Sequence, residues 1–112
     1  MVLISDSVEA AGMPDGEYSL GGQRVIKQGS RAVLANGCTT EGGALAGSVS
    51  NLYDCLMKAV EFGIPLESAV RAATMNPCIS VGLFDRFGSI EPGKAARFLI
   101  LNRDDLSIKM VI

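Results

Sequence analysis

A short apolar run at positions 2–4 places the strongest constraint on how this chain can fold. The run lacks polar alternation and is followed at once by Ser5 and Asp6, which is the pattern of a buried strand. Buried strands of this kind belong to parallel sheets that are covered on both faces. Such a strand needs neighbours on both sides, and the rest of this sequence offers few. We therefore expect the chain to be part of a larger sheet or barrel.

Turn signals divide the next region into three short strands. Gly21 and Gly22 are suited to a two-residue hairpin turn between strands expected at residues 17–20 and 23–27. A second turn at residues 28–30, Gln-Gly-Ser, precedes a strand expected at residues 31–34. The pattern predicts a small antiparallel meander.

The middle of the chain shows helical periodicity after a glycine-rich loop. The apolar residues that share one face of a 3.6-residue period are Val49, Leu52, Tyr53, Leu56 and Val60. Ser48 is the expected N-cap of this helix, and Gly63 the expected stop. A second helix is expected over residues 66–75.

Proline and glycine punctuation organises the rest of the chain. Asn76 and Pro77 are expected to act as N-cap and first residue of a short helix over residues 77–82. A turn-rich connector then leads to strands expected at residues 97–101 and 107–112. The fold class predicted is α/β, or mixed α+β for the piece by itself.

Composition excludes several functions. The formal net charge of −2 gives no basic face for nucleic acid, and no apolar run reaches the ~20 residues of a membrane span. The chain has no histidine, so it lacks the commonest general base and metal ligand. Its cysteines, Cys38, Cys55 and Cys78, are odd in number and widely spaced, which predicts buried thiols. A cytoplasmic location is the default expectation.

Five collinear segments carry a resemblance to one family. They are residues 3–7 (LISDS), 12–18 (GMPDGEY), 44–48 (ALAGS), 72–77 (AATMNP) and 88–94 (GSIEPGK). They resemble the L-[VI]-[ST]-D-[AS], G-x-x-[DE]-G-x-Y and L-[AS]-G-S motifs, and the C-terminal tail, of the N-acetylglucosamine-6-phosphate deacetylases. These are TIM-barrel enzymes of the amidohydrolase superfamily. The tail alone is weak evidence, because many amidohydrolases share it.

The resemblance implies that the chain is the C-terminal part of such an enzyme. Residues 1–83 would be the last part of the barrel domain, and residues 84–112 would be strands of a small composite β-sandwich. The implied reaction hydrolyses N-acetylglucosamine 6-phosphate to glucosamine 6-phosphate and acetate, in amino-sugar catabolism. The implied assembly is a homo-oligomer.

Asp6 is the candidate catalytic residue. It closes an apolar strand, and active sites of TIM barrels form at the C-terminal ends of the strands. The resemblance implies that Asp6 takes a proton from the attacking water and returns it to the departing amine. The simpler interpretation is an aspartate that ends a strand at a turn.

Leu45, Ala46, Gly47 and Ser48 are the candidate substrate-binding residues. A glycine-rich loop before a helix exposes backbone N–H groups to a ligand, and the resemblance implies contact with the acetamide of the sugar. The simpler interpretation is a Ser48 N-cap beside flexible glycines.

The resemblance implies that a divalent metal, zinc or similar, is bound in the full-length enzyme by residues outside this chain. We therefore expect no metal ligand here, and no deacetylase activity from the chain alone. Glu41 stands in an irregular loop and is expected to be an exposed carboxylate.

Two departures from the family and two rival interpretations stand beside this hypothesis. Arg97 occupies the place of the usual tail aspartate, and the loop at residues 38–43 is longer than the compact family version.

One rival interpretation is a fragment of another amidohydrolase, such as a dihydroorotase. The other is a non-catalytic, self-associating structural module, because a cut barrel exposes apolar strand edges.

Overall fold

A computed structural model describes residues 1–35 and 44–112 of the chain. The predictions that concern Cys38, Glu41 and the length of the loop at residues 38–43 lie outside the described residues. The chain forms two compact units. One consists of Leu3–Pro65, and the other of Met1–Val2 together with Leu66–Ile112.

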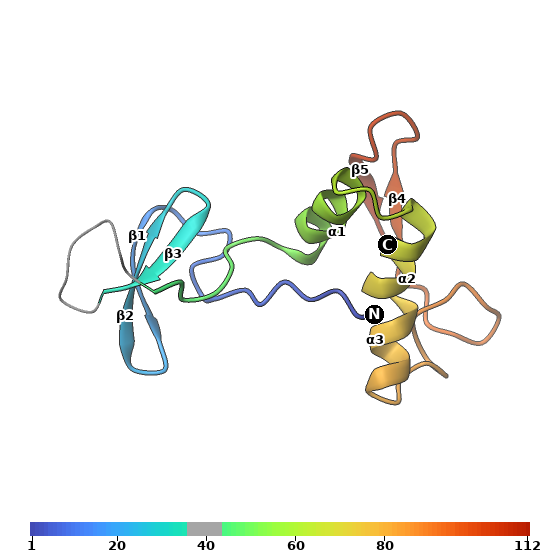
Figure 1. Ribbon diagram of the computed structural model, residues 1–112. Coiled ribbons are helices and arrows are strands. Elements are labelled where there is room, and N and C mark those ends of the chain that lie inside the picture. The colour runs from blue at the N-terminus through green and yellow to red at the C-terminus, as the bar shows by residue number, and fades with distance from the viewer. Residues whose placement is uncertain (36–43) are drawn as a thin grey trace. The chain divides into compact units, whose positions relative to one another are not determined.

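Three antiparallel strands form the sheet of the Leu3–Pro65 unit, as Figure 1 shows. The strands are β1 (Gly16–Leu20), β2 (Gln23–Gln28) and β3 (Arg31–Leu34), in the order β1-β2-β3. Gly21 and Gly22 have φ angles of 56° and 82°, and two positive values in succession suit the tight hairpin turn between β1 and β2. The predicted meander is therefore confirmed.

The strand predicted at residues 2–4 is wrong for this structure. These residues belong to no strand, and the Val2 and Ile4 side chains are 43% and 69% exposed. The nearest regular pairing is a single parallel bridge between Ser7 and Ser48. A parallel strand is stabilised by neighbours along its length, and the described residues supply a partner only at this one point.

A small apolar core lies beneath the meander. It consists of Val25, Ala32 and Ala46, and the partly buried side chains of Val8, Leu34 and Val49 pack against it. Ala46 reaches this core because its segment pairs with β3. The amide of Ala46 donates to the carbonyl of Ala32, with an N–O distance of 2.9 Å.

Helix α1 (Leu52–Glu61) begins after Asn51, so the prediction of Ser48 as its N-cap is wrong. The Asn51 side chain accepts from the Asp54 amide at 2.9 Å, and the Asp54 carboxylate accepts from the Asn51 amide at 3.3 Å, which completes a capping box. Ser48 cannot cap this helix because its backbone is bonded to the segment around Asp6. Gly63, with φ of 99°, follows the helix end as expected.

The second unit contains α2 (Leu66–Ala73) and α3 (Met75–Ser80). The predicted start of α3 is wrong, because its N-cap is Thr74 and Pro77 is its third residue. Proline is tolerated there because the first amides of a helix have no helical acceptor. The Asn76 side chain instead donates to the carbonyl of Met1 at 2.6 Å.

The turn-rich connector at residues 88–94 contacts α3. Gly88 has φ of +95°, and a Cβ added there would lie 2.9 Å from the Cβ of Cys78. The Lys94 side chain is 10% exposed, with Nζ 3.4 Å from the centroid of the Phe84 ring and 2.8 Å from the Glu91 carboxylate. Hydrogen bonds from Lys94 and Ser89 hold the pKa of Glu91 below its ordinary value. This connector is thus tied to the unit by both packing and charge.

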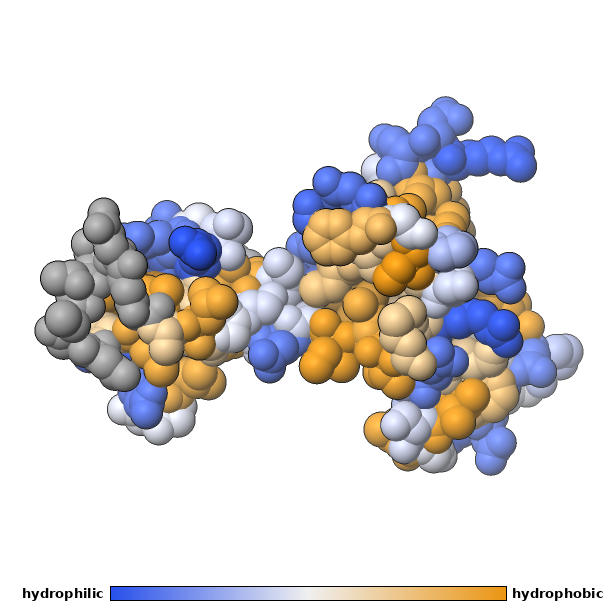
Figure 2. All heavy atoms as spheres, in the orientation of Figure 1, coloured by the Kyte–Doolittle hydropathy of each residue, from blue (hydrophilic) through white to orange (hydrophobic). Residues whose placement is uncertain are grey.

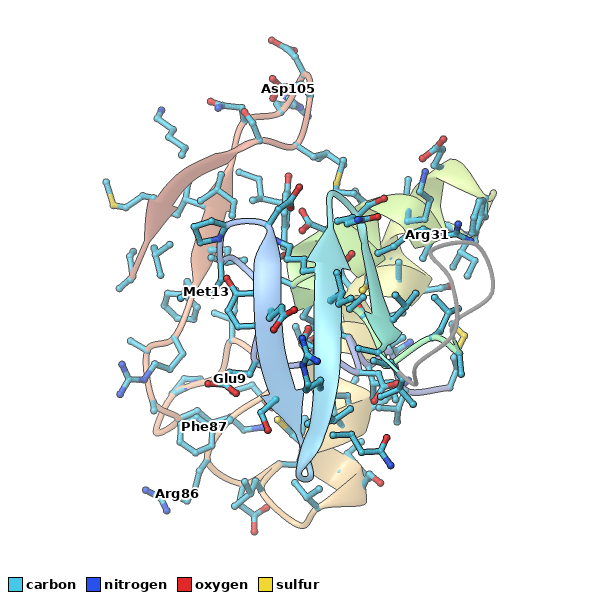
Figure 3. The ribbon with its side chains drawn as sticks, turned by 90° about the vertical axis from the view of Figure 1, so that its left-hand side faces the viewer. Glu9, Met13, Arg31, Arg86, Phe87 and Asp105 are labelled. Atoms are coloured by element: carbon cyan, nitrogen blue, oxygen red, sulfur yellow. The ribbon has the colours of Figure 1, made fainter. Side chains whose placement is uncertain are left out.

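A two-stranded antiparallel hairpin completes the second unit. Its strands, β4 (Leu99–Leu101) and β5 (Ile108–Val111), confirm both predicted C-terminal strands, although each is shorter than expected. Figure 2 shows hydrophilic residues at the tip of this hairpin and apolar residues along its strands. Asp105, labelled at the tip in Figure 3, accepts hydrogen bonds from the Ser107 hydroxyl and amide that lower the pKa of its carboxyl.

Much of the apolar surface of the hairpin is exposed. The exposed fraction is 49% for Leu99, 52% for Met110 and 70% for Val111. A two-stranded hairpin has too little area to bury both of its faces by itself.

Candidate functional site

Asp6 lies where two distant parts of the Leu3–Pro65 unit meet. Its carbonyl accepts a hydrogen bond from the Ser48 amide, and the Val8 amide donates to the Ser48 carbonyl, both at 2.9 Å. The Ser7 hydroxyl also donates to the carbonyl of Ser50. These bonds bring the predicted catalytic residue and the predicted substrate-binding segment together.

The backbone of Asp6 adopts an uncommon conformation. Its φ is 49°, in the left-handed region that non-glycine residues seldom occupy, although aspartate is among the more tolerant types. The Asp6 side chain is exposed, so its carboxylate is open to solvent. Residues held in sparsely populated backbone conformations cluster at functional sites, so this φ angle marks Asp6 as a candidate.

Gly47 makes the close approach to Asp6 possible. Its φ is +116°, and a Cβ added there would lie 3.0 Å from the Asp6 carbonyl oxygen and 2.8 Å from Cγ1 of Val8. The same position lies 3.9 Å from Oδ2 of Asp6. Only glycine combines this backbone conformation with the absence of a side chain.

The other predicted substrate-binding residues are presented differently. Leu45 is 68% exposed, and its backbone forms an isolated antiparallel bridge with Val33 of β3. Ala46 is 8% exposed, and its methyl group belongs to the core. The Ser48 hydroxyl accepts from the Ser50 amide at 2.9 Å. The side chain of Ala46 is therefore structural, whereas Leu45 faces outward.

The hydrogen-bonded contact between residues 6–8 and 48–50 is called the junction below. Sequence reasoning missed two of its residues, Val8 and Ser50. Val8 packs on the core and pairs with Ser48, and Ser50 accepts the Ser7 hydroxyl. Neither residue stands in a motif that marks it, because both contribute through pairing between segments far apart in the sequence.

The side chains of the described residues do not gather as a divalent metal site requires. Within residues 1–35 and 44–112, no three His, Cys, Asp or Glu side chains gather as a metal site requires. Asp6 supplies a carboxylate, and the sequence contains no histidine that could join it. In the same part of the chain, no helix is both long and apolar enough to cross a bilayer.

The amidohydrolase family model matches residues 24–112 of this sequence. The chain belongs to the amidohydrolase family. The match begins within β2 and runs through the connector and the β4–β5 hairpin. It therefore takes in residues 45–48 of the junction, whereas Asp6 precedes it.

Curated relatives extend the likeness over nearly the whole chain. The N-acetylglucosamine-6-phosphate deacetylase of Caenorhabditis elegans is 36% identical over 107 residues, which are 93% of this chain and 24% of the relative. The N-acetylgalactosamine-6-phosphate deacetylase of Escherichia coli O157:H7 is 35% identical over 103 residues, which are 91% of this chain and 26% of the relative. The chain thus spans about a quarter of the length of these relatives.

A solved structure shows the same relation. A mutant N-acetyl-D-glucosamine-6-phosphate deacetylase from Mycobacterium smegmatis, in complex with N-acetyl-D-glucosamine 6-phosphate, is 31% identical with a TM-score of 0.84. The similarity covers 99% of this chain and 28% of the solved chain. The mixed α/β arrangement described above is therefore shared with part of a larger deacetylase.

Proposed function

We propose that this chain forms part of an amino-sugar-phosphate deacetylase and supplies the catalytic carboxylate, Asp6, of its site. The observation that carries this proposal is the hydrogen-bonded junction between Asp6 and Ser48. It joins the aspartate to the segment that the resemblance assigns to substrate binding. The likeness to named deacetylases over 93% of the chain supports the same conclusion.

The proposed architecture is the end of a TIM barrel followed by strands of a small second domain. Residues 1–83 belong to the barrel in this proposal, and residues 84–112 to the β-sandwich. The TM-score of 0.84 to a chain more than three times as long supports a piece that keeps its conformation within a larger fold. The exposed apolar residues of the β4–β5 hairpin also support it, because additional strands would cover them.

Asp6 acts by proton transfer in this proposal. Its carboxylate accepts a proton from the water whose oxygen forms the new bond to the acetamide carbon. As the carbon–nitrogen bond breaks, the same proton passes to the amine nitrogen, so the products are the free amino sugar and acetate. Asp6 is exposed, which leaves its carboxylate accessible for both transfers.

Residues outside this chain supply the metal ligands in the proposed enzyme. Amidohydrolases generally use a divalent metal, and the described carboxylates and thiols do not gather as a metal site requires. The proposal therefore gives this chain by itself no deacetylase activity. It places the whole enzyme in the cytoplasm as a homo-oligomer.

The substrate class is an N-acetylhexosamine 6-phosphate. Relatives named for the glucosamine and the galactosamine compounds are 36% and 35% identical to this chain, so both sugars are candidates. In this proposal Leu45, which is 68% exposed, contacts the acetyl group that both sugars share.

The test is a complementation assay with zinc. The chain is mixed with the remainder of a deacetylase, and acetate release is measured from each of the two N-acetylhexosamine 6-phosphates. We expect activity only in the mixture, with a loss of at least ~10²-fold in Asp6→Asn, the lower end of what a general base contributes.

Asp85→Asn is the matched control, since Asp85 is also exposed. This variant is expected to keep the activity of the unmodified mixture. Equal activity of the Asp6 and Asp85 variants would refute the catalytic role of Asp6.

A further inference from the structure

We infer that Gly47 is a positioning residue for Asp6, acting through the backbone of Asp6 rather than through contact with substrate. This inference rests on the proposed function, since it concerns the carboxylate to which that function assigns catalysis. It gives Gly47 a role distinct from those of Leu45 and Ser48 in the same segment.

The first support is the fit between the two residues. The position of a Cβ on Gly47 lies 3.0 Å from the Asp6 carbonyl oxygen, which is tighter than nearly all real Cβ contacts. That oxygen is also the acceptor for the Ser48 amide at 2.9 Å. A side chain at position 47 would therefore push against the same atom that the next residue must hold.

The second support is the conformation of Asp6 itself. Its φ of 49° is costly for a residue with a side chain, and neighbouring contacts must maintain it. Two hydrogen bonds of the Ser7–Ser48 bridge are those contacts. The Ser48 amide donates to the Asp6 carbonyl, and the Val8 amide donates to the Ser48 carbonyl. Displacing the Asp6 carbonyl weakens the bond that it accepts from the Ser48 amide and changes where the carboxylate points.

Two consequences separate positioning from simple folding. The Asp6 carboxylate would be displaced while the core below it, built on Val25 and Ala32, stays folded. A displacement of about 1 Å at a reacting group costs about 10²-fold in rate. The effect should therefore appear in kcat and leave KM within a factor of about two.

The first experiment uses the full 112-residue chain. Amide hydrogen exchange followed by NMR compares Gly47→Ala with Gly63→Ala. Gly63 is a matched control because its φ is +99° and a Cβ there meets nothing within 4 Å. We expect the Ser48 amide to exchange about tenfold faster in Gly47→Ala, equivalent to the net contribution of one hydrogen bond, and at its original rate in Gly63→Ala.

A third variant separates the two contacts at position 47. Val8→Ala removes Cγ1, the atom 2.8 Å from the added Cβ, but leaves the 3.0 Å approach to the Asp6 carbonyl. If Gly47 acts on Asp6, the Gly47→Ala/Val8→Ala double variant keeps the fast Ser48 exchange. Restoration of slow exchange by Val8→Ala would overturn the inference, because the crowding would then be with the core.

The second experiment measures kcat and KM of the same variants in the zinc-supplemented mixture, normalised to the folded fraction of the chain. A loss of about 10²-fold in kcat for Gly47→Ala, with Gly63→Ala unaffected, is the expected result. Unchanged kcat, or a rise in KM alone, would overturn the inference. An inactive unmodified mixture would count against the proposed function, while the exchange rates of Ser48 would still decide whether Gly47 holds Asp6.

Discussion

Truncation of Val25 to alanine should destabilise the Leu3–Pro65 unit and with it the junction at Asp6. Val25 is 1% exposed and packs with Ala32 and Ala46, so its side chain joins the meander to the segment that ends at the junction. The substitution removes the equivalent of two methylene groups, or about 1.6 kcal/mol at about 0.8 kcal/mol each. Incomplete collapse of the cavity adds to this, so the free energy of unfolding should fall by about 2–3 kcal/mol.

Urea denaturation followed by tyrosine fluorescence measures this change. The chain has two tyrosines, Tyr18 and Tyr53, and both belong to the Leu3–Pro65 unit. With a denaturant dependence of about 1 kcal/mol per molar urea, the midpoint should fall by about 2–3 M, or the variant should be unfolded without urea.

Ile4→Ala serves as the control in the same unit. It deletes a larger side chain, but one that is 69% exposed, so its effect should stay within about 0.5 kcal/mol. Equal midpoints for Val25→Ala and Ile4→Ala would refute the assignment of the core.

Two further predictions concern the capping box and the connector. Asn51→Ala should lower the free energy of unfolding by about 1 kcal/mol in the same urea assay, whereas Asn51→Ser, which keeps a capping oxygen, should lower it by less. For Glu91, whose pKa is held below 4.5 mainly by the hydrogen bond from Lys94, the ionised form stabilises the fold above pH 4.5. This stabilisation should be lost as the pH falls from 4.5 through the lowered pKa, and Lys94→Met should move the pKa of Glu91 back up in a carboxyl NMR titration. An unchanged Glu91 pKa in that variant would contradict the connector geometry.

The local features of the fold could be predicted because they depend on neighbouring residues. Gly21 and Gly22 adopt the positive φ angles that a two-residue hairpin requires, and β3 has the predicted bounds of residues 31–34. Turn chemistry involves a few adjacent residues, so the sequence contains all that decides it.

Helix starts were harder to predict because they depend on which polar groups remain available. Ser48 has the right chemistry for an N-cap, but its amide and carbonyl are bonded to Asp6 and Val8. Asn51, which has no such pairing, caps α1 instead. Similarly, Pro77 fits the third position of α3 as well as the first, because the early amides of a helix need no helical acceptor.

Local sequence patterns were enough to predict the meander, the presence of helices and the two candidate segments around Asp6 and Gly47. The tertiary structure alone decided that these segments meet, that Ala46 faces the core, and that residues 2–4 form no strand. The difference follows from the range of the interactions. Turns and helical faces arise from contacts between near neighbours in the sequence. The Asp6–Ser48 junction instead requires backbone pairing between a residue before the meander and a residue after it. No local pattern encodes such pairing, because it depends on where the intervening strands place both partners.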